Sequence, residues 1–259
     1  MLFDTHMHCE YSCDSKMNIE EAIVASEKLN IGMIVTEHWD FDYPTNPDAF
    51  IFDLDKGINS HLKKRSERVL VGLEIGIQPH LTKENNTVAN SKDFDFIIAS
   101  LHCLDGFDLY ETSKYIINDK NYYLKKALKE TIQCLTNFKN YDTLGHIDYI
   151  TRYMPFENSY LSYEAMPKLW DDLLKLLIKD GKVLEINTRK LDDEKNVQSL
   201  NIIYKRYAEL GGKYVTLGSD AHYKKDVGRR LKVAKKMAEK LGLKPVYFKR
   251  RKLVICSDD

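Results

Sequence analysis

The chain lacks the features that would place it in a membrane or outside the cell. No apolar run reaches about 18 residues, the length that a membrane-spanning helix needs. The first residues carry no positively charged stretch followed by an apolar one, as a signal peptide would. The 5 cysteines are odd in number and have no C-x-x-C spacing, which argues against a disulfide framework and for a reducing compartment. We therefore expect a cytoplasmic protein with no membrane partner.

An excess of charge of one sign is also missing. The 39 lysines and arginines balance 39 aspartates and glutamates, so no net field attracts the chain to nucleic acid. Basic residues outnumber acidic ones between Lys224 and Lys252, but their spacing is that of a solvated helix face or an edge strand. No basic groove interleaved with aromatic residues is evident, so we expect no nucleic-acid partner.

Proline and glycine are few, 6 and 12 residues, and nowhere gather into a linker. Internal repeats and low-complexity tracts are absent from the sequence as well. The hydrophobic content of 43% is ample for a large core. We expect a single domain over residues 1–259.

Short apolar segments alternate with amphipathic segments along the whole chain. The apolar segments predict strands at 1–6, 32–36, 69–77, 94–100, 142–145, 183–187, 214–218 and 246–255. The amphipathic segments predict helices at 18–29, 53–68, 121–138, 163–179, 199–210 and 227–241. This alternation is typical of an α/β protein with a parallel sheet, and seven or eight such units fit a closed barrel better than an open sheet.

Histidine and acidic residues recur near the end of nearly every predicted strand. His6 and His8 stand two residues apart on an extended segment, so their imidazoles project to the same side. A single strand-end histidine is more often structural, but nine candidate metal ligands share this placement: His6, His8, Asp14, His38, Glu74, His102, His146, Asp220 and His222. Because the carboxyl ends of parallel strands meet on one face of a barrel, we expect these side chains to surround one cavity.

The composition of this set indicates a metal centre. Glu74 stands within an apolar strand, where a carboxylate is costly to bury without a cation. Six imidazoles and three carboxylates suit two or three divalent ions, and a nitrogen and oxygen set without thiolate suits Zn, Mn or Fe. Such a cluster activates water and stabilises charge on the attacking and leaving oxygens of a phosphorus displacement. We therefore expect metal-assisted hydrolysis of a phosphate ester.

Four further residues with ligating side chains are set aside. His61 falls in a predicted helix, and His80 falls in a loop, where it is a candidate to support Glu74 indirectly. Cys9 and Cys103 each follow a proposed ligand directly, so strand alternation turns them away from the site and predicts that they pack in the core.

The stretches DTHMH, TEH, GLE, SLH, GH and GSDAH, in this order and at these intervals, resemble the four motifs of the PHP (polymerase and histidinol phosphatase) superfamily. The resemblance covers the whole chain and is greatest to the histidinol-phosphatase branch, through stretches such as GLEIGIQPH and LGHIDYITRY. It implies a distorted (β/α)7 barrel, similar to a TIM barrel, with a trinuclear metal site at the carboxyl ends of the strands. The ion sites that it implies consist of His6, His8, Glu74 and Asp220 for the first ion, Glu74, His102 and His146 for the second, and Asp14, His38 and His222 for the third.

The activity that the resemblance implies is the hydrolysis of L-histidinol phosphate to L-histidinol and phosphate, a step of histidine biosynthesis. The chain departs from the pattern where Asp14 replaces a histidine of many relatives, and where Arg189 and Lys190 replace a frequent Ser-Gly pair. Two alternatives stay open. Some relatives act on other small phosphate esters or on nucleic-acid ends, and a metal module without catalysis is disfavoured because all nine positions hold competent ligands.

Candidate substrate contacts lie on the loops after the strands. Arg152, six residues past His146, is the first candidate for bidentate phosphate binding, and Arg189 is the second. The leaving alkoxide needs a proton from Asp220, His222 or a metal-bound water. We also expect an acidic and aromatic mouth for the cationic end of the substrate, unless the same loops are ordinary solvated surface. Its predicted residues are Glu10, Asp40, Asp42, Asp105 and Asp108, with Trp39, Phe41, Tyr43 and Phe107.

Overall fold

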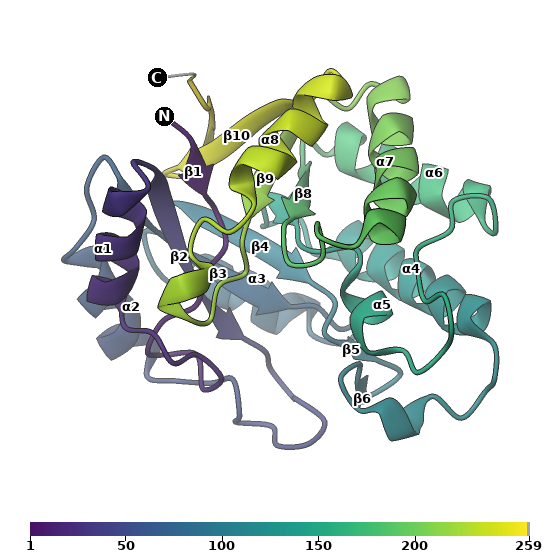
Figure 1. Cartoon of the computed structure of the whole chain (residues 1–259). Coiled ribbons are helices and arrows are strands. Elements are labelled where there is room, and N and C mark those ends of the chain that lie inside the picture. Colours follow the sequence, from purple (N-terminus) through teal and green to yellow (C-terminus); the bar gives the residue numbers. More distant parts are fainter. Residues whose placement is uncertain (258–259) are drawn as a thin grey trace.

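Seven parallel strands form a closed ring in the computed structural model, which describes residues 1–257 (Figure 1). In spatial order the strands are β1 (Phe3–Asp4), β2 (Gly32–Trp39), β3 (Val69–Gly76), β4 (Phe96–Ser100), β7 (Thr143–Leu144), β8 (Val183–Asn187) and β9 (Tyr214–Gly218). The ring closes where the chain after β1 meets β9. There Thr5 N–H donates to the Leu217 carbonyl at 2.9 Å, and Met7 bridges Ala221 in parallel. The fold is the α/β barrel that the alternation of segments predicts.

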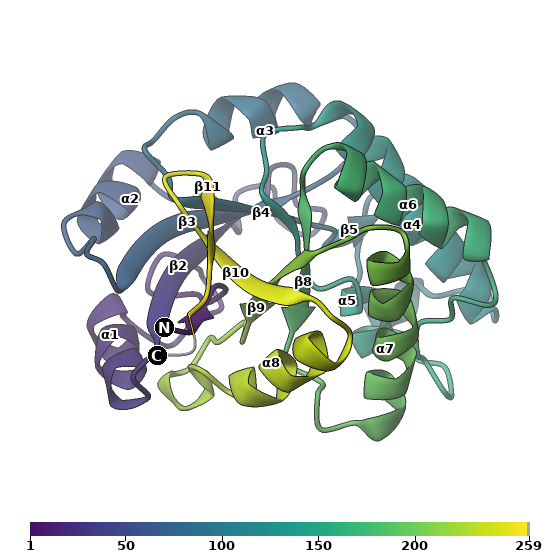
Figure 2. The ribbon, with the colours of Figure 1, turned by 90° about the horizontal axis from the view of Figure 1, so that it is seen from above.

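Helices connect successive strands around the outside of the ring, as Figure 2 shows. They are α1 (Ile19–Lys28), α2 (Leu54–Leu62), α3 (Thr82–Ala89), α4 (Lys120–Asn137), α6 (Pro167–Lys179), α7 (Glu194–Glu209) and α8 (Leu231–Lys240). The short helix α5 (Tyr149–Tyr153), between β7 and α6, lies at the carboxyl ends of the strands instead. Helix α1 begins as its sequence predicts, because Asn18 and Glu21 cap each other's backbone N–H groups. Its apolar face then packs on the barrel. Among residues 1–257, no helix combines the length and apolar character needed to cross a membrane.

A C-terminal hairpin crosses the amino ends of the strands, at the near end of the ring in Figure 2. The segment 246–255, predicted as one strand, is two antiparallel strands, β10 (Lys244–Lys249) and β11 (Lys252–Ile255). Arg250 and Arg251 turn the chain with positive φ angles of 51° and 63°. Asp95 accepts the Arg250 N–H at 2.9 Å, and Arg251 Nε donates to Asp142 at 2.6 Å. These contacts with the barrel hold the turn that divides the segment into two strands.

Other departures from the predicted elements lie in connecting segments. The helix predicted at 53–68 ends at Leu62, because Ser66 N–H donates to the Val69 carbonyl and forms a turn instead. Elements not predicted are α3, α5 and an antiparallel pair formed by β5 (Cys103–Leu104) and β6 (Phe107–Asp108). These elements are short, so their sequence periodicity is too brief to identify them.

Candidate metal centre

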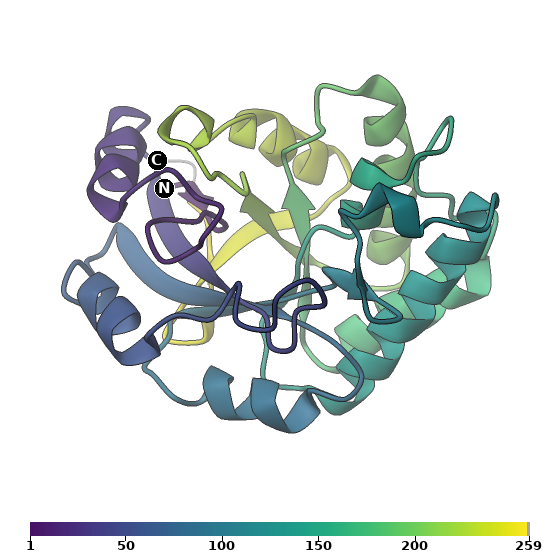
Figure 3. The same ribbon diagram turned by 90° about the horizontal axis from the view of Figure 1, so that it is seen from below.

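The nine predicted ligands converge at the carboxyl ends of the strands, on the side seen in Figure 3. His38 and Glu74 lie within β2 and β3, and the other seven lie on the connections that follow the strands. Glu74 is fully buried at the centre of the group. Five imidazole nitrogens lie 2.8–3.4 Å from its two oxygens, and they belong to His6, His8, His38, His102 and His146. Glu74 would therefore be a suitable ligand for a metal ion held together with these imidazoles.

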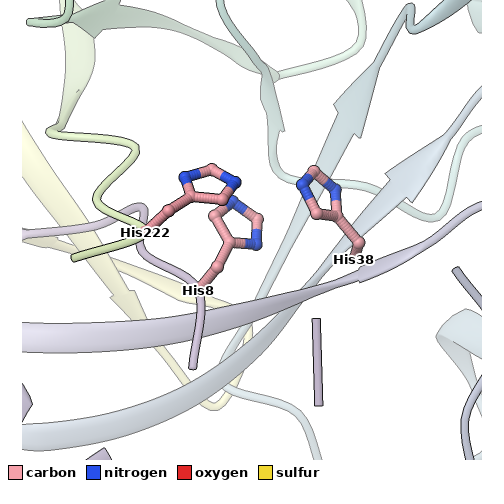
Figure 4. A group of neighbouring side chains, drawn as sticks. All are labelled: His8, His38 and His222. Carbon is pink, nitrogen blue, oxygen red and sulfur yellow. The ribbon is translucent and has the colours of Figure 1, made fainter. Parts of the chain in front are cut away.

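The remaining ligands form the outer part of the group. The imidazoles of His8, His38 and His222 lie together, and each offers a nitrogen within 4.8 Å of the others (Figure 4). Asp14 Oδ2 lies 3.2 Å from His222 Nε2 and 3.7 Å from His38 Nε2. Asp220 Oδ1 lies 3.5 Å from His8 Nε2 and 3.6 Å from His222 Nδ1. All nine residues thus share one continuous site.

Several buried polar atoms of the site have no hydrogen-bond partner, which tests whether these residues fit metal ions. The buried atoms without a hydrogen-bond partner are Glu74 Oε2, His38 Nδ1 and His102 Nε2. The two imidazole nitrogens nevertheless face the oxygens of the Glu74 carboxylate. Buried polar atoms are normally hydrogen-bonded, so a convergent set without partners needs another occupant. Nitrogen and oxygen atoms without thiolate are suitable ligands for borderline divalent ions. The residues therefore fit a metal cluster.

The charges of the site favour the ligand forms of Glu74 and His8, whereas neighbouring carboxylates raise the pKa values of the buried His6, His38 and His102. Burial would raise the pKa of Glu74, but the imidazoles of His6, His102 and His38 outweigh burial and hold its pKa well below the usual range. Burial lowers the pKa of His8, and the neighbouring His38 and His222 lower it further. Ionised carboxylates and neutral imidazoles are the forms that bind metals.

Three residues behind the ligands orient them, and none of the three was predicted in this role. Glu185 Oε1 accepts a hydrogen bond from His6 Nδ1 at 2.7 Å, and Asp40 Oδ1 accepts one from His102 Nδ1 at 2.7 Å. Ser12 Oγ lies 3.2 Å from His8 Nδ1. Such partners determine which ring nitrogen faces the metal. Glu185 stands in the apolar strand VLEIN, so the burial argument used for Glu74 would have found it.

The two candidate phosphate-binding arginines line a cavity of about 560 Å³ above the ligands. Arg152 is buried, and it donates to Asp220 Oδ2 at 2.8 Å and to Asp148 Oδ1 at 3.3 Å. Burial alone would lower the pKa of Arg152, but both carboxylates raise it, so the guanidinium stays charged. Arg189 is exposed at the rim and donates to the Asp220 carbonyl at 3.3 Å. Asp220 has a positive φ of 55°, a strained conformation of the kind that gathers at functional sites.

The predicted acidic mouth is mostly wrong. Of its five acids only Asp108 lines the cavity. Asp40 is committed to His102, and the others bind elsewhere: Glu10 to the Ile19 N–H, Asp42 to His80 and Asp105 to Lys126. His80 is therefore not a support for Glu74. The mouth is aromatic instead, with Tyr43 as predicted and, in addition, Phe50, Tyr110, Tyr149, Tyr153 and Tyr223.

Comparison with known proteins identifies the family. The sequence pattern of the PHP domain family matches residues 4–189. The chain belongs to the PHP domain family. A protein of Clostridium acetobutylicum, named probable histidinol-phosphatase, is 44% identical to this PHP-domain chain over 251 residues, which cover 97% of this chain and 98% of that protein. The histidinol-phosphatase of Lactococcus lactis is 30% identical over 92% of this chain and 91% of that protein.

A solved structure shares the whole fold of this PHP-domain chain. The crystal structure of histidinol phosphate phosphatase from Lactococcus lactis, complexed with Zn, L-histidinol and phosphate, superposes with a TM-score of 0.90. It is 29% identical and covers 98% of each chain. The resemblance inferred from the motifs and the predicted PHP barrel are thereby confirmed.

Proposed function

We propose that this chain is a metal-dependent phosphomonoesterase that hydrolyses L-histidinol phosphate to L-histidinol and phosphate, a step of histidine biosynthesis. The observation that carries the proposal is that nine candidate metal ligands, two arginines and an aromatic wall meet in one cavity. The similarity to histidinol-phosphatases over nearly the full length supports the same substrate. We also propose that residues 1–259 form one catalytic domain.

Two or three divalent ions, Zn, Mn or Fe, would be held by the ligand sets that the resemblance implies. These sets are His6, His8, Glu74 and Asp220, then Glu74, His102 and His146, and finally Asp14, His38 and His222. Divalent ions in such a site activate water and neutralise charge on phosphate oxygens. Glu74 is a suitable bridging ligand because five imidazoles surround its two oxygens.

The arginines would bind the phosphate of the substrate. Arg152 is held in place by Asp148 and Asp220, so its planar guanidinium is oriented before the substrate arrives. Arg189 reaches the same cavity from the exposed rim. Asp220 and His222 line the cavity beside Arg152 and are the candidates for proton transfer between the attacking water and the leaving oxygen.

The amino alcohol and imidazole of the substrate would lie against the aromatic wall. Phe50 and Tyr43 pack edge to face at 4.6 Å, and Tyr110 and Tyr153 do so at 4.9 Å. Among residues 1–257, Asp108 is the one acidic residue that lines the cavity without being a candidate metal ligand. Its Oδ1 accepts the Tyr110 N–H at 2.8 Å, so the segment that follows β6 orients the carboxylate. We propose that Asp108 binds the cationic end of the substrate.

A phosphomonoester panel tests the proposal. kcat/KM is measured for L-histidinol phosphate, 4-nitrophenyl phosphate and other small esters, with metals quantified on the same sample. We expect metal-containing protein and a clear preference for L-histidinol phosphate. Equal rates on all esters would refute the substrate, and full activity in protein that contains no metal would refute the metal-dependent reaction class.

A further inference from the structure

Glu37 and His61 form a fully buried pair behind the metal centre that the proposed reaction does not use. His61 Nε2, on helix α2, donates to Glu37 Oε1 at 2.8 Å. Glu37 precedes the ligand His38 in β2. Since neighbouring residues of a strand point to opposite faces, Glu37 faces the helix layer while His38 faces the cavity.

Glu37 also accepts hydrogen bonds from the loop that follows His8. Its Oε2 accepts the Cys9 N–H at 3.0 Å and the hydroxyl of Ser12, and its Oε1 accepts the Tyr11 N–H at 3.4 Å. All of these neighbours are donors, so Glu37 acts as a carboxylate that only accepts. The hydrogen of the Ser12 hydroxyl is therefore committed to Glu37.

Because the Ser12 hydroxyl donates its hydrogen to Glu37, it can only accept in its other hydrogen bonds. Ser12 Oγ accepts the His38 N–H at 3.0 Å and lies 3.2 Å from His8 Nδ1. With its only hydrogen given to Glu37, the hydroxyl can only accept from His8. Nδ1 of His8 must then carry the hydrogen, which leaves the lone pair on Nε2. His8 Nε2 is the atom that faces Glu74 at 3.4 Å and Asp220 at 3.5 Å.

We propose that Glu37, supported by His61, acts through Ser12 to select the ring nitrogen that His8 presents to the metal. Glu37 and His61 are positioning residues, because neither lines the cavity or belongs to the nine candidate ligands. The inference rests on the metal site of the proposed function and extends it to helix α2. His61 Nδ1 is buried without a partner, so the contribution of His61 is the single Nε2–H that it gives to Glu37.

Zinc binding to the full chain tests the inference. Zn²⁺ affinity is measured by competition with a chromophoric chelator, zinc per chain by elemental analysis, and the His8 tautomer in the zinc-loaded protein by ¹⁵N chemical shifts. The variants are S12A, E37Q and H61L. We expect about a 10-fold loss of affinity for at least one ion, as for other groups that orient ligand histidines. H61Q retains an amide donor and should stay close to wild type.

The control variant is R251Q, which breaks the contact with Asp142 at the opposite end of the barrel. It should lower the melting temperature and leave zinc affinity unchanged. Wild-type affinity and His8 tautomer in S12A and E37Q would overturn the inference, as would a loss in R251Q equal to that in H61L. If the wild type binds no zinc, the proposed metal site itself fails. If it binds zinc and hydrolyses L-histidinol phosphate while S12A matches it, only this inference fails.

Discussion

Glu185 Oε1 accepts a hydrogen bond from His6 Nδ1 at 2.7 Å, so His6 must present Nε2 to the metal centre. The second oxygen of Glu185 accepts the His146 N–H at 2.7 Å, so one carboxylate orients two candidate ligands. Glycine at 218 permits this approach, because a Cβ there would lie 2.1 Å from Glu185 Oε1.

Glu185→Gln should therefore weaken metal binding. The amide carries one acceptor and one donor, so either the His6 or the His146 contact is lost. We expect a loss of about 10- to 100-fold in zinc affinity, measured by chelator competition. The matched control is Asp95→Asn, a buried carboxylate at the amino ends of the strands that accepts the N–H groups of Val71 and Arg250. It should affect stability alone, and an equal loss of zinc affinity in both variants would contradict the role of Glu185.

Removal of metal should abolish phosphatase activity and lower the melting temperature. A ligand that binds only the folded state stabilises it by about 2.7 kcal/mol at a concentration 100-fold above its Kd. Dialysis against a chelator, followed by calorimetry and phosphate release, measures both effects. Adding Zn²⁺ or Mn²⁺ back should restore both. Full activity in protein shown by elemental analysis to be metal-free would exclude the proposed reaction class.

Arg152 and Arg189 should differ in their effects. Arg152→Met leaves the buried carboxylates of Asp148 and Asp220 without a cation, and breaking such a pair costs about 3–5 kcal/mol of unfolding free energy. Arg189→Met removes an exposed donor, so stability should change little. Loss of one hydrogen bond to the phosphate, about 1.5–3 kcal/mol, should raise KM roughly 10- to 100-fold. Urea unfolding and steady-state kinetics separate the two effects, and an unchanged KM in Arg189→Met would remove Arg189 from the phosphate site.

Asp108→Asn should reduce selectivity for the cationic substrate. We expect kcat/KM for L-histidinol phosphate to fall about 10-fold or more, since a hydrogen bond to a charged group is worth about 1.5–3 kcal/mol. The value for 4-nitrophenyl phosphate, which has no cationic group, should stay within about twofold. Asp105→Asn is the control, because Asp105 lies in the turn of the same β5–β6 hairpin but pairs with Lys126 outside the cavity. An equal fall for both esters in Asp108→Asn would contradict the assignment.

Burial should make three of the five thiols unreactive. It raises the pKa of Cys134 to about 12 and also raises the pKa values of Cys9 and Cys103, so little thiolate exists at pH 8. A thiol-specific chromogenic reagent should titrate at most Cys13, which is exposed, and Cys256, which is partly exposed. All five should react in guanidinium.

These raised pKa values also give the stability a pH dependence. The folded state retains thiol protons that the unfolded state releases near pH 8.5, so the free energy of unfolding should fall as the pH rises above about 8.5. In the thiol titration, rapid reaction of more than two thiols in the native protein would show that at least one of Cys9, Cys103 and Cys134 is accessible.

Residues that carry their own physical signal could be predicted from the sequence. Glu74 amid apolar neighbours and histidines at successive strand ends indicated the metal centre, because burial cost and strand periodicity are local properties. The role of Asp40 was not predictable in this way. Its position after β2 suggested the mouth of the cavity, but its carboxylate contacts His102, 62 positions later in the chain.

The sequence by itself determined the α/β class, the family and the nine candidate ligands, since alternating strands and motif order can be read along one chain. Only the tertiary structure decided that Glu185 and Ser12 orient imidazoles, that Asp108 alone among the predicted acids reaches the cavity, and that 246–255 folds back as a hairpin across the barrel. The reason is physical. A hydrogen bond depends on distances of about 3 Å between atoms whose residues are far apart in sequence, and closure of the barrel establishes those distances.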